Sequence, residues 1–376
     1  MHHRILVLLL GLFALAGTAV AQDQPDKWYD RIDLFGDARL RYEGFRQDDN
    51  FNDDRRDRFR MRLRVGIEIA ITDALKVGIQ ARNGDPDDPV SNNTSFDGAF
   101  QFKEFNLAQG YVDFRAASWL DVIGGKFEAG KRWTVSDFQW DDDVTVEGVM
   151  ENIHLPSDAA RYDGLELVAY QFLLEESGSG DDAFVFGGQA RANFDVTEHD
   201  AIGFGVGFDY WDNPQAVVDL TLDGDLRGNR VTNLLDANGQ LVSDFEIVNL
   251  FAEWKHSRSE RWPIKVNLFY YQNLGAKGVG EDQDTGFFGR VQYGDYKTKG
   301  QVALRYSYYY SEPDALFYVF TQSDTSRASD VKGHRFDVRV GFVARSYFNV
   351  TWYHTEAAYA KDESLDRWQV DYIVRF

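Results

Sequence analysis

Cysteine is absent from the 376-residue sequence, so no disulfide bond can hold its fold together. Proline is scarce, with seven residues, and this scarcity suits a chain of many strands because proline cannot donate to the hydrogen-bond ladder of a sheet. Basic residues are outnumbered: 40 Lys and Arg face 61 Asp and Glu, a formal net charge of −21 at pH 7. That balance argues against nucleic acid as a partner.

Long apolar runs are also missing, apart from one at the N-terminus. It extends from Ile5 to about Ala16, which is shorter than the ~20 residues of a membrane-spanning helix. Small residues follow at positions 19 to 21, and this arrangement predicts a secretory signal peptide, residues 1–21, cleaved after Ala21. The mature chain, residues 22–376, is then expected to be exported, to lack a transmembrane helix, and to form one domain that is either soluble or a β-barrel.

Aromatic residues are plentiful, at 15% of the chain, which argues against disorder. Apolar and polar residues alternate in many segments. The clearest is 58–71, where seven apolar residues alternate with polar ones such as Arg60, Arg62 and Arg64. A period of two that lasts 13 residues favours a tilted membrane strand over the shorter strand of a soluble sheet.

Sixteen such segments are predicted as strands: 34–45, 58–71, 74–83, 104–115, 120–127, 146–154, 165–174, 183–195, 202–211, 245–255, 264–274, 286–293, 301–310, 335–345, 348–359 and 367–376. Short connections alternate with mostly longer, more acidic ones. The sequence therefore predicts an all-β fold, a transmembrane antiparallel up-and-down β-barrel of about 16 strands with short periplasmic turns and long external loops. A soluble β-sandwich is the alternative, and the strand lengths argue against it.

Aromatic residues gather near the predicted strand ends. Trp119, Trp254 and Trp262 lie by short turns, whereas Trp133 and Trp211 lie toward long loops. Amphipathic rings at both membrane interfaces would account for this distribution.

A barrel of this size has a lumen too wide for side chains to fill, so it is expected to hold water. The alternation places charged side chains on the lumen face, because charge facing lipid is costly. The basic residues predicted to line the lumen are Arg39, Arg41, Arg60, Arg62, Arg64, Arg82, Arg305 and Arg339. We expect some of the lumen charges to pair with carboxylates of the wall, and the arginines of segment 58–71 to be left to meet solute.

The third long loop, residues 128–145, is the candidate constriction. It carries four acidic residues that would face arginines of the opposite wall: Asp137, Asp141, Asp142 and Asp143. Acid on the loop facing base on the wall would produce a transverse field that orients polar solutes. A solvated acidic surface loop is the alternative.

Three short motifs carry a family resemblance: Gly125-Lys126-Phe127, Trp140-Asp141-Asp142-Asp143 and Glu147-Gly148. Together with the alternating strands and the terminal Phe376, they resemble the putative porin family of Gram-negative bacteria. The resemblance implies an outer-membrane channel for passive diffusion of small hydrophilic solutes or ions, in contact with outer-membrane lipid and lipopolysaccharide. In porins of about this size the third external loop commonly narrows the barrel. Such barrels often form trimers, so a homotrimer is compatible with the sequence.

No catalytic, cofactor or metal site is predicted. Histidines are scattered without metal-ligand spacing, and none belongs to a recognisable motif with a nucleophile. A barrel hydrolase is therefore disfavoured. A porin selective for phosphate, another anion or a sugar stays open, as does an adhesive or structural barrel without a channel.

Overall fold

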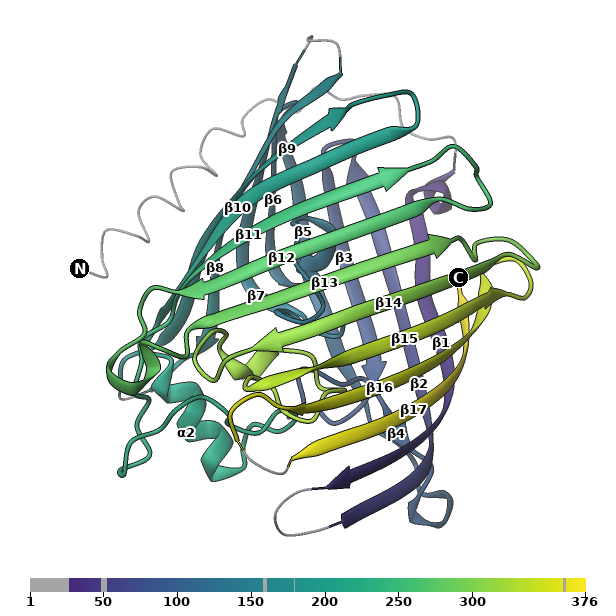
Figure 1. The fold of residues 1–376 in the computed structure, drawn as a ribbon. Helices are drawn as coiled ribbons and strands as arrows, with labels where there is room; N and C mark the ends of the chain where they lie inside the picture. Colours follow the sequence, from purple (N-terminus) through teal and green to yellow (C-terminus); the bar gives the residue numbers. More distant parts are fainter. Residues whose placement is uncertain (1–26, 49–52, 158–160, 179, 361–362) are drawn as a thin grey trace.

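The computed structural model describes residues 27–48, 53–157, 161–178, 180–360 and 363–376. The predicted signal peptide lies outside these residues. Sixteen long antiparallel strands form a closed ring (Figure 1), as the alternation predicted. Their bounds are β1 (Ile32–Asp48), β2 (Asp53–Thr72), β3 (Leu75–Asn83), β5 (Phe105–Ala117), β6 (Leu120–Phe127), β7 (Val146–Pro156), β8 (Tyr162–Glu175), β9 (Ala183–Asp195), β10 (Asp200–Asp212), β11 (Glu246–His256), β12 (Ile264–Asn273), β13 (Thr285–Gly294), β14 (Val302–Ser311), β15 (Val331–Gly341), β16 (Ser346–Ala357) and β17 (Ser364–Arg375).

The ring closes where β1 pairs with both β2 and β17. Leu40 on β1 lies opposite Met61 on one side and Tyr372 on the other. The short strand β4 (Thr94–Ser95) pairs only with the part of β2 that β3 does not reach. It was not predicted, because two residues carry no periodic signal.

The remaining regular elements are short. They are the helix α2 (Gln215–Asp223) and the 3-10 turns η2 (Trp28–Arg31), η3 (Gly98–Phe100), η4 (Ala129–Lys131), η5 (Gly278–Gly280) and η6 (Tyr318–Phe320). Within the described ranges, no helix has the length and apolar character needed to cross a membrane.

Side chains alternate between the two faces of the wall as predicted. On β1, Leu34 and Leu40 are 61% and 57% exposed on the outer face, whereas Asp37, Arg39 and Glu43 are buried on the inner face. The apolar face of the ring is therefore the outer one, where lipid can cover it, and charged side chains point into the barrel.

One strand is displaced from its predicted bounds. The segment expected at 335–345 begins four residues earlier as β15, and the residues after Gly341 form the turn to β16. Lys332, Gly333 and His334 break the apolar alternation and so resemble a loop in the sequence. Arg345 adopts a left-handed φ of 60°, which a turn accepts and a strand does not.

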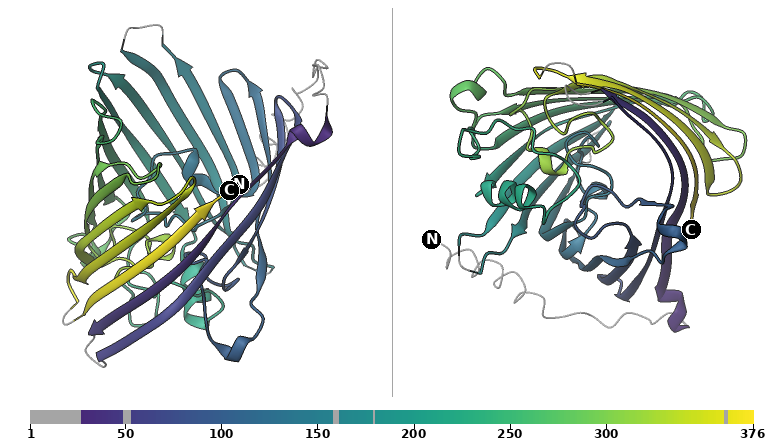
Figure 2. Two further views of the ribbon diagram at one scale, coloured as in Figure 1. Left: turned by 90° about the vertical axis from the view of Figure 1, so that its right-hand side faces the viewer. Right: turned by 90° about the horizontal axis from the view of Figure 1, so that it is seen from below.

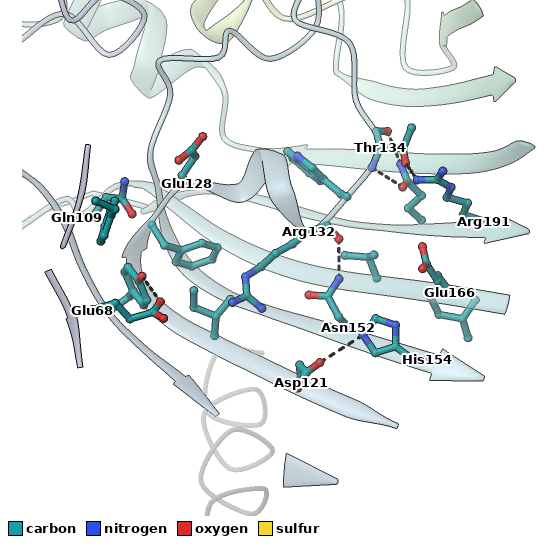
Figure 3. Close-up of a pocket in the computed structure, with 18 residues that line it drawn as sticks. Glu68, Gln109, Asp121, Glu128, Arg132, Thr134, Asn152, His154, Glu166 and Arg191 are labelled. Atoms are coloured by element: carbon teal, nitrogen blue, oxygen red, sulfur yellow. Dashed lines mark hydrogen bonds and ion pairs between the residues drawn. The ribbon is translucent and has the colours of Figure 1, made fainter. Parts of the chain in front are cut away.

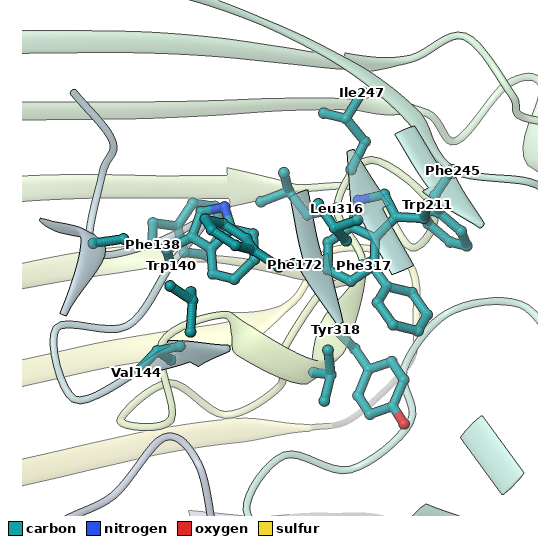
Figure 4. Close-up of a cluster of buried hydrophobic side chains, with 14 of the residues drawn as sticks. Phe138, Trp140, Val144, Phe172, Trp211, Phe245, Ile247, Leu316, Phe317 and Tyr318 are labelled. Carbon is teal, nitrogen blue, oxygen red and sulfur yellow. The ribbon is translucent and has the colours of Figure 1, made fainter. Parts of the chain in front are cut away.

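Seen from below, the strands enclose an interior into which connecting segments fold (Figure 2, right). A buried cluster of aromatic and aliphatic side chains packs inside the ring against β6–β14 (Figure 4). Trp140 of loop 128–145 stacks on Trp211 at a ring separation of 5.9 Å and on Phe320 at 4.9 Å. Apolar packing therefore occupies part of this half of the lumen, which the sequence predicted to be wet throughout.

Two tryptophans expected at the membrane interface belong to this interior instead. Trp211 is 5% exposed, and Trp133 packs edge-on against Tyr170 at 4.9 Å between ring centroids. The prediction was wrong because a ring near a strand end can face inward, and connections that fold into the barrel then cover it.

The close packing of β1 against β2 and β17 can be tested by a substitution at Gly36. A Cβ added at Gly36 would overlap the carbonyl oxygen of Arg64 and lie 2.9 Å from the ring of Phe376. Gly36→Val should therefore push β1 away from β2 and β17 and cost about 1–3 kcal/mol of stability. Its folded band should be lost at a lower temperature in a heat-modifiability gel. Gly110→Val is the control, since nothing lies within 4 Å of a Cβ at that position; equal melting of the two variants would contradict the close approach.

Candidate functional site

Loop 128–145 crosses the inside of the barrel. Near its start, the Arg132 guanidinium donates to Asp113 of β5 at 2.5 Å. Further along, the backbone N–H of Thr134 donates to Gln189 of β9 at 2.8 Å, and Gln139 donates to Asp209 of β10 at 2.7 Å. The loop is thus attached to several strands on one side before it reaches the other wall.

Two carboxylates of the loop form ion pairs with strands on different sides of the barrel. Asp137 accepts from the Arg290 guanidinium of β13 at 2.7 and 2.6 Å and lies 3.5 Å from Arg335 of β15. Asp143 lies 3.0 Å from Arg62 and 3.7 Å from Arg64, both on β2. These pairs hold the loop between β2 and β13–β15.

A cavity of about 590 Å³ lies between this loop and the arginine-rich wall. Twelve arginines and eight acidic residues are among its lining residues. Eleven of the twelve predicted lumen and loop residues line it: Arg39, Arg41, Arg60, Arg62, Arg64, Arg305, Arg339, Asp137, Asp141, Asp142 and Asp143. The structure therefore places these acidic and basic residues around one space.

Arg82 is the predicted residue that does not line the cavity. Its side chain is buried beside the loop and donates to the backbone carbonyl of Asp143 at 3.1 Å. It supports the loop through this contact with the backbone and does not itself line the cavity.

The arginines of β2 face the cavity but are paired, which corrects the expectation that they are left to meet solute. Arg62 donates to Asp37 at 2.9 Å, and Arg64 also donates to Asp37. Arg58 donates to Glu43 at 2.8 Å, and Arg60 lies 3.8 Å from the same carboxylate. Carboxylates of β1 lie next to these arginines in the sheet, so pairing costs no rearrangement of the backbone.

A second connection, residues 312–330, also reaches the cavity, and the sequence analysis missed it. Asp324 pairs with Arg367 of β17 at 2.6 Å and accepts from Gln369 at 2.9 Å. The backbone N–H of Ser323 donates to Asp141, so the two loops are in contact. No periodic signal marks such a loop, since its position depends on the aromatic packing inside the barrel.

The loop carboxylates differ in their proton affinity. Burial by itself would raise the pKa of Asp143, but Arg62 and Arg64 hold that pKa well below its usual range. Burial also acts to raise the pKa of Asp137, but Arg290 and Arg335 outweigh it, so that this pKa is lowered as well. Burial raises the pKa of Asp141 well above its usual range, with Asp143 adding to the shift.

Two further carboxyl groups that line the cavity also have raised pKa values. Burial, reinforced by Asp137, raises the pKa of Asp142, and burial raises the pKa of Asp88 to about 6. The tethering carboxylates therefore stay charged over a range of pH in which their neighbours take up protons.

A second cavity, of about 480 Å³, lies next to the start of the loop (Figure 3). It is lined mainly by β5–β9 and the start of the loop, with polar residues that include Glu68, Arg132 and Glu166. His154 lies 3.3 Å from Asp121 at its edge. No signal in the sequence distinguishes these residues from the rest of the lumen face.

Comparison with known proteins decides the family. The family model described as "Putative porin" matches residues 49–224 and 226–376, which is nearly the whole chain. The chain belongs to the putative porin family. It is an outer-membrane porin, a β-barrel channel for passive diffusion, and the family and fold indicate a channel rather than an enzyme. No curated protein matches the chain.

Solved structures share the fold at low sequence identity. OprB of Pseudomonas putida is 12% identical, with 92% of this chain and 94% of that chain aligned and a TM-score of 0.56. A mutant of the Rhodopseudomonas blastica porin is also 12% identical, with 92% and 100% aligned and a TM-score of 0.50. At this identity the similarity concerns the fold alone.

The upward pKa shifts predict a pH-dependent selectivity. As the pH falls from 7.5 to 5, Asp88 takes up a proton near pH 6, and the raised pKa values of Asp141 and Asp142 favour their protonated forms. Asp137 and Asp143 stay charged, because their pKa values are lowered. The cavity becomes more positive, so the reversal potential in a KCl gradient should move toward the chloride potential. Asp88→Asn should lose the part of this change centred near pH 6, and a shift toward the potassium potential would contradict the assignment.

Proposed function

We propose that solutes cross the porin through the arginine-lined cavity, with loop 128–145 as its constriction. The observation that supports this path is the arrangement of opposite charges around one cavity: loop carboxylates on one side and the arginines of β1, β2, β13–β15 and β17 on the other. The hydrophobic cluster on β6–β14 occupies much of the other side of the barrel at the level of Trp140. The path is therefore off-centre, close to the strands where the ring closes.

A transverse field follows from this charge arrangement and explains why small hydrophilic solutes would pass. Polar molecules can align with a field between acidic and basic walls, whereas apolar molecules must displace ordered water without any compensating interaction. Asp142 lines the cavity and contributes negative charge on the loop side when it is ionised. The site thus selects for polarity and size without any covalent chemistry.

The processing and the surroundings of the barrel are part of the same proposal. We expect residues 1–21 to be removed as a signal peptide and residues 22–376 to form the single barrel domain. The exposed apolar outer face, with Leu34, Phe59 and Trp368, supports contact with outer-membrane lipid and lipopolysaccharide. A homotrimer stays a prediction.

Planar-bilayer conductance tests the constriction. The purified wild-type porin should give discrete, roughly ohmic steps. A variant with both Asp137→Asn and Asp143→Asn loses the ion pairs that hold the loop to the two walls. Removing one partner from a buried ion pair costs about 3–5 kcal/mol. The loop should then leave its position, so that single-channel conductance and current noise both increase.

Asp87→Asn is the matched control, since Asp87 is exposed and does not line the cavity. It should leave the step size unchanged. Unaltered conductance in the double variant would reject loop 128–145 as the constriction. Absence of any current from folded wild-type protein would reject the proposed path.

A further inference from the structure

Four arginines of the cavity wall differ from the rest in the partners that hold them. Arg39 donates to the neutral side chain of Asn93 at 2.5 Å, and Arg305 donates to Gln292 at 2.9 and 3.3 Å. In the described part of the chain, neither is joined to a carboxylate by an ion pair. Their charge is therefore held in place by amide oxygens but not neutralised.

Arg339 and Arg375 have mainly neutral partners as well. Arg339 donates to the Tyr296 hydroxyl at 3.1 Å and to Asn349 at 3.3 Å. Its nearest carboxylate, Asp337, is 3.9 Å away and already accepts two hydrogen bonds from Arg335, at 2.8 and 2.9 Å.

Among the described residues, the Arg375 guanidinium donates to the Tyr347 hydroxyl alone, at 3.3 Å. The Tyr296 and Tyr347 rings contact each other at 4.6 Å, with Arg339 5.2 Å from one ring centroid and Arg375 5.4 Å from the other. The two guanidinium groups are therefore fixed on a tyrosine pair.

These four residues lie on one continuous stretch of wall. Arg305 and Arg339 belong to the neighbouring strands β14 and β15, and Arg375 and Arg39 belong to the neighbouring strands β17 and β1. All four line the same cavity. An ion moving along this wall would meet them together with the paired arginines of β2.

We propose that these four arginines form a binding station for small oxyanions, carboxylates or phosphates, within the channel. A guanidinium presents planar N–H donors that match two oxygens of a carboxylate or phosphate, and such charge-assisted bonds are about twice as strong as neutral ones. Arg39 is 9% exposed, and among the described residues its Nε has no hydrogen-bond partner and its guanidinium has no ion-paired carboxylate, so its charge is buried with little compensation at contact distance. An oxyanion supplies the missing negative charge.

The station suits transport as well as binding. An ion must bind well enough to enter and weakly enough to leave, and several sites along one wall meet both needs. Each guanidinium keeps a neutral partner, so it stays oriented when the anion moves on. This inference rests on the proposed path along the arginine wall and adds the class of solute that binds there.

The test is block of chloride current by inorganic phosphate or by succinate, with the full-length porin in a planar bilayer. Both additives should reduce the chloride current in a saturable way. A variant with Arg39→Gln and Arg305→Gln should need roughly tenfold more additive for half block. Arg115→Gln removes the same kind of charge from an exposed position outside this cavity. Half block of this variant should need the same additive concentration as half block of the wild type.

The outcomes separate this inference from the proposed path. Block by only one additive supports the station and identifies it as a phosphate or a carboxylate site. Intact chloride current without saturable block by either additive overturns the station and leaves the proposed path standing. Equal block in the double variant and the wild type also overturns the station. A protein that conducts no chloride at all overturns the proposed path together with it.

Discussion

The shape of the channel depends on ion pairs that cross the lumen. Asp137 holds one part of loop 128–145 to Arg290, and Asp143 holds its end to Arg62. Without such pairs a ring of 16 strands would enclose a space too wide to discriminate among small solutes. With them, the loop packs Trp140 against the aromatic half of the barrel and leaves a polar cavity along the opposite wall.

Burying so many charges inside a protein is normally unfavourable, and the pairing explains why it is tolerated here. Asp37 serves both Arg62 and Arg64, and Glu43 serves Arg58. Removing either partner from such a buried pair is costly, whereas the intact pair is nearly neutral in energy. Charge is therefore fixed by pairs within the sheet. Arg39 and Arg305 form no ion pair with a carboxylate among the described residues, so their charge is left for a solute.

The strands and their faces could be predicted from the sequence because a strand imposes a period of two on side chains that face lipid or water. That rule places Leu40 outside and Arg39 inside without any knowledge of the loops. The position of the acidic loop opposite the arginines was predicted from the alternation of short and long connections. Eleven of the twelve predicted residues accordingly line one cavity.

Contacts between loops had no comparable signal. The position of Asp324, the inward packing of Trp211 and the contact of Arg82 with the loop backbone depend on tertiary packing, for which a single sequence has no periodic pattern. The pairing of the β2 arginines was misjudged for a related reason. Alternation shows which face a side chain occupies but not how far the neighbouring carboxylate neutralises it.

Cysteine modification during conductance measurement tests the off-centre channel most directly, since the native chain has no cysteine. Ile373→Cys introduces a thiol on the cavity wall, and Val185→Cys introduces one in the hydrophobic cluster on β9. A charged thiol reagent should react with the first variant and change its conductance, and should leave the second unaltered. Modification of Val185→Cys with a change in conductance, while Ile373→Cys stays inert, would contradict the account.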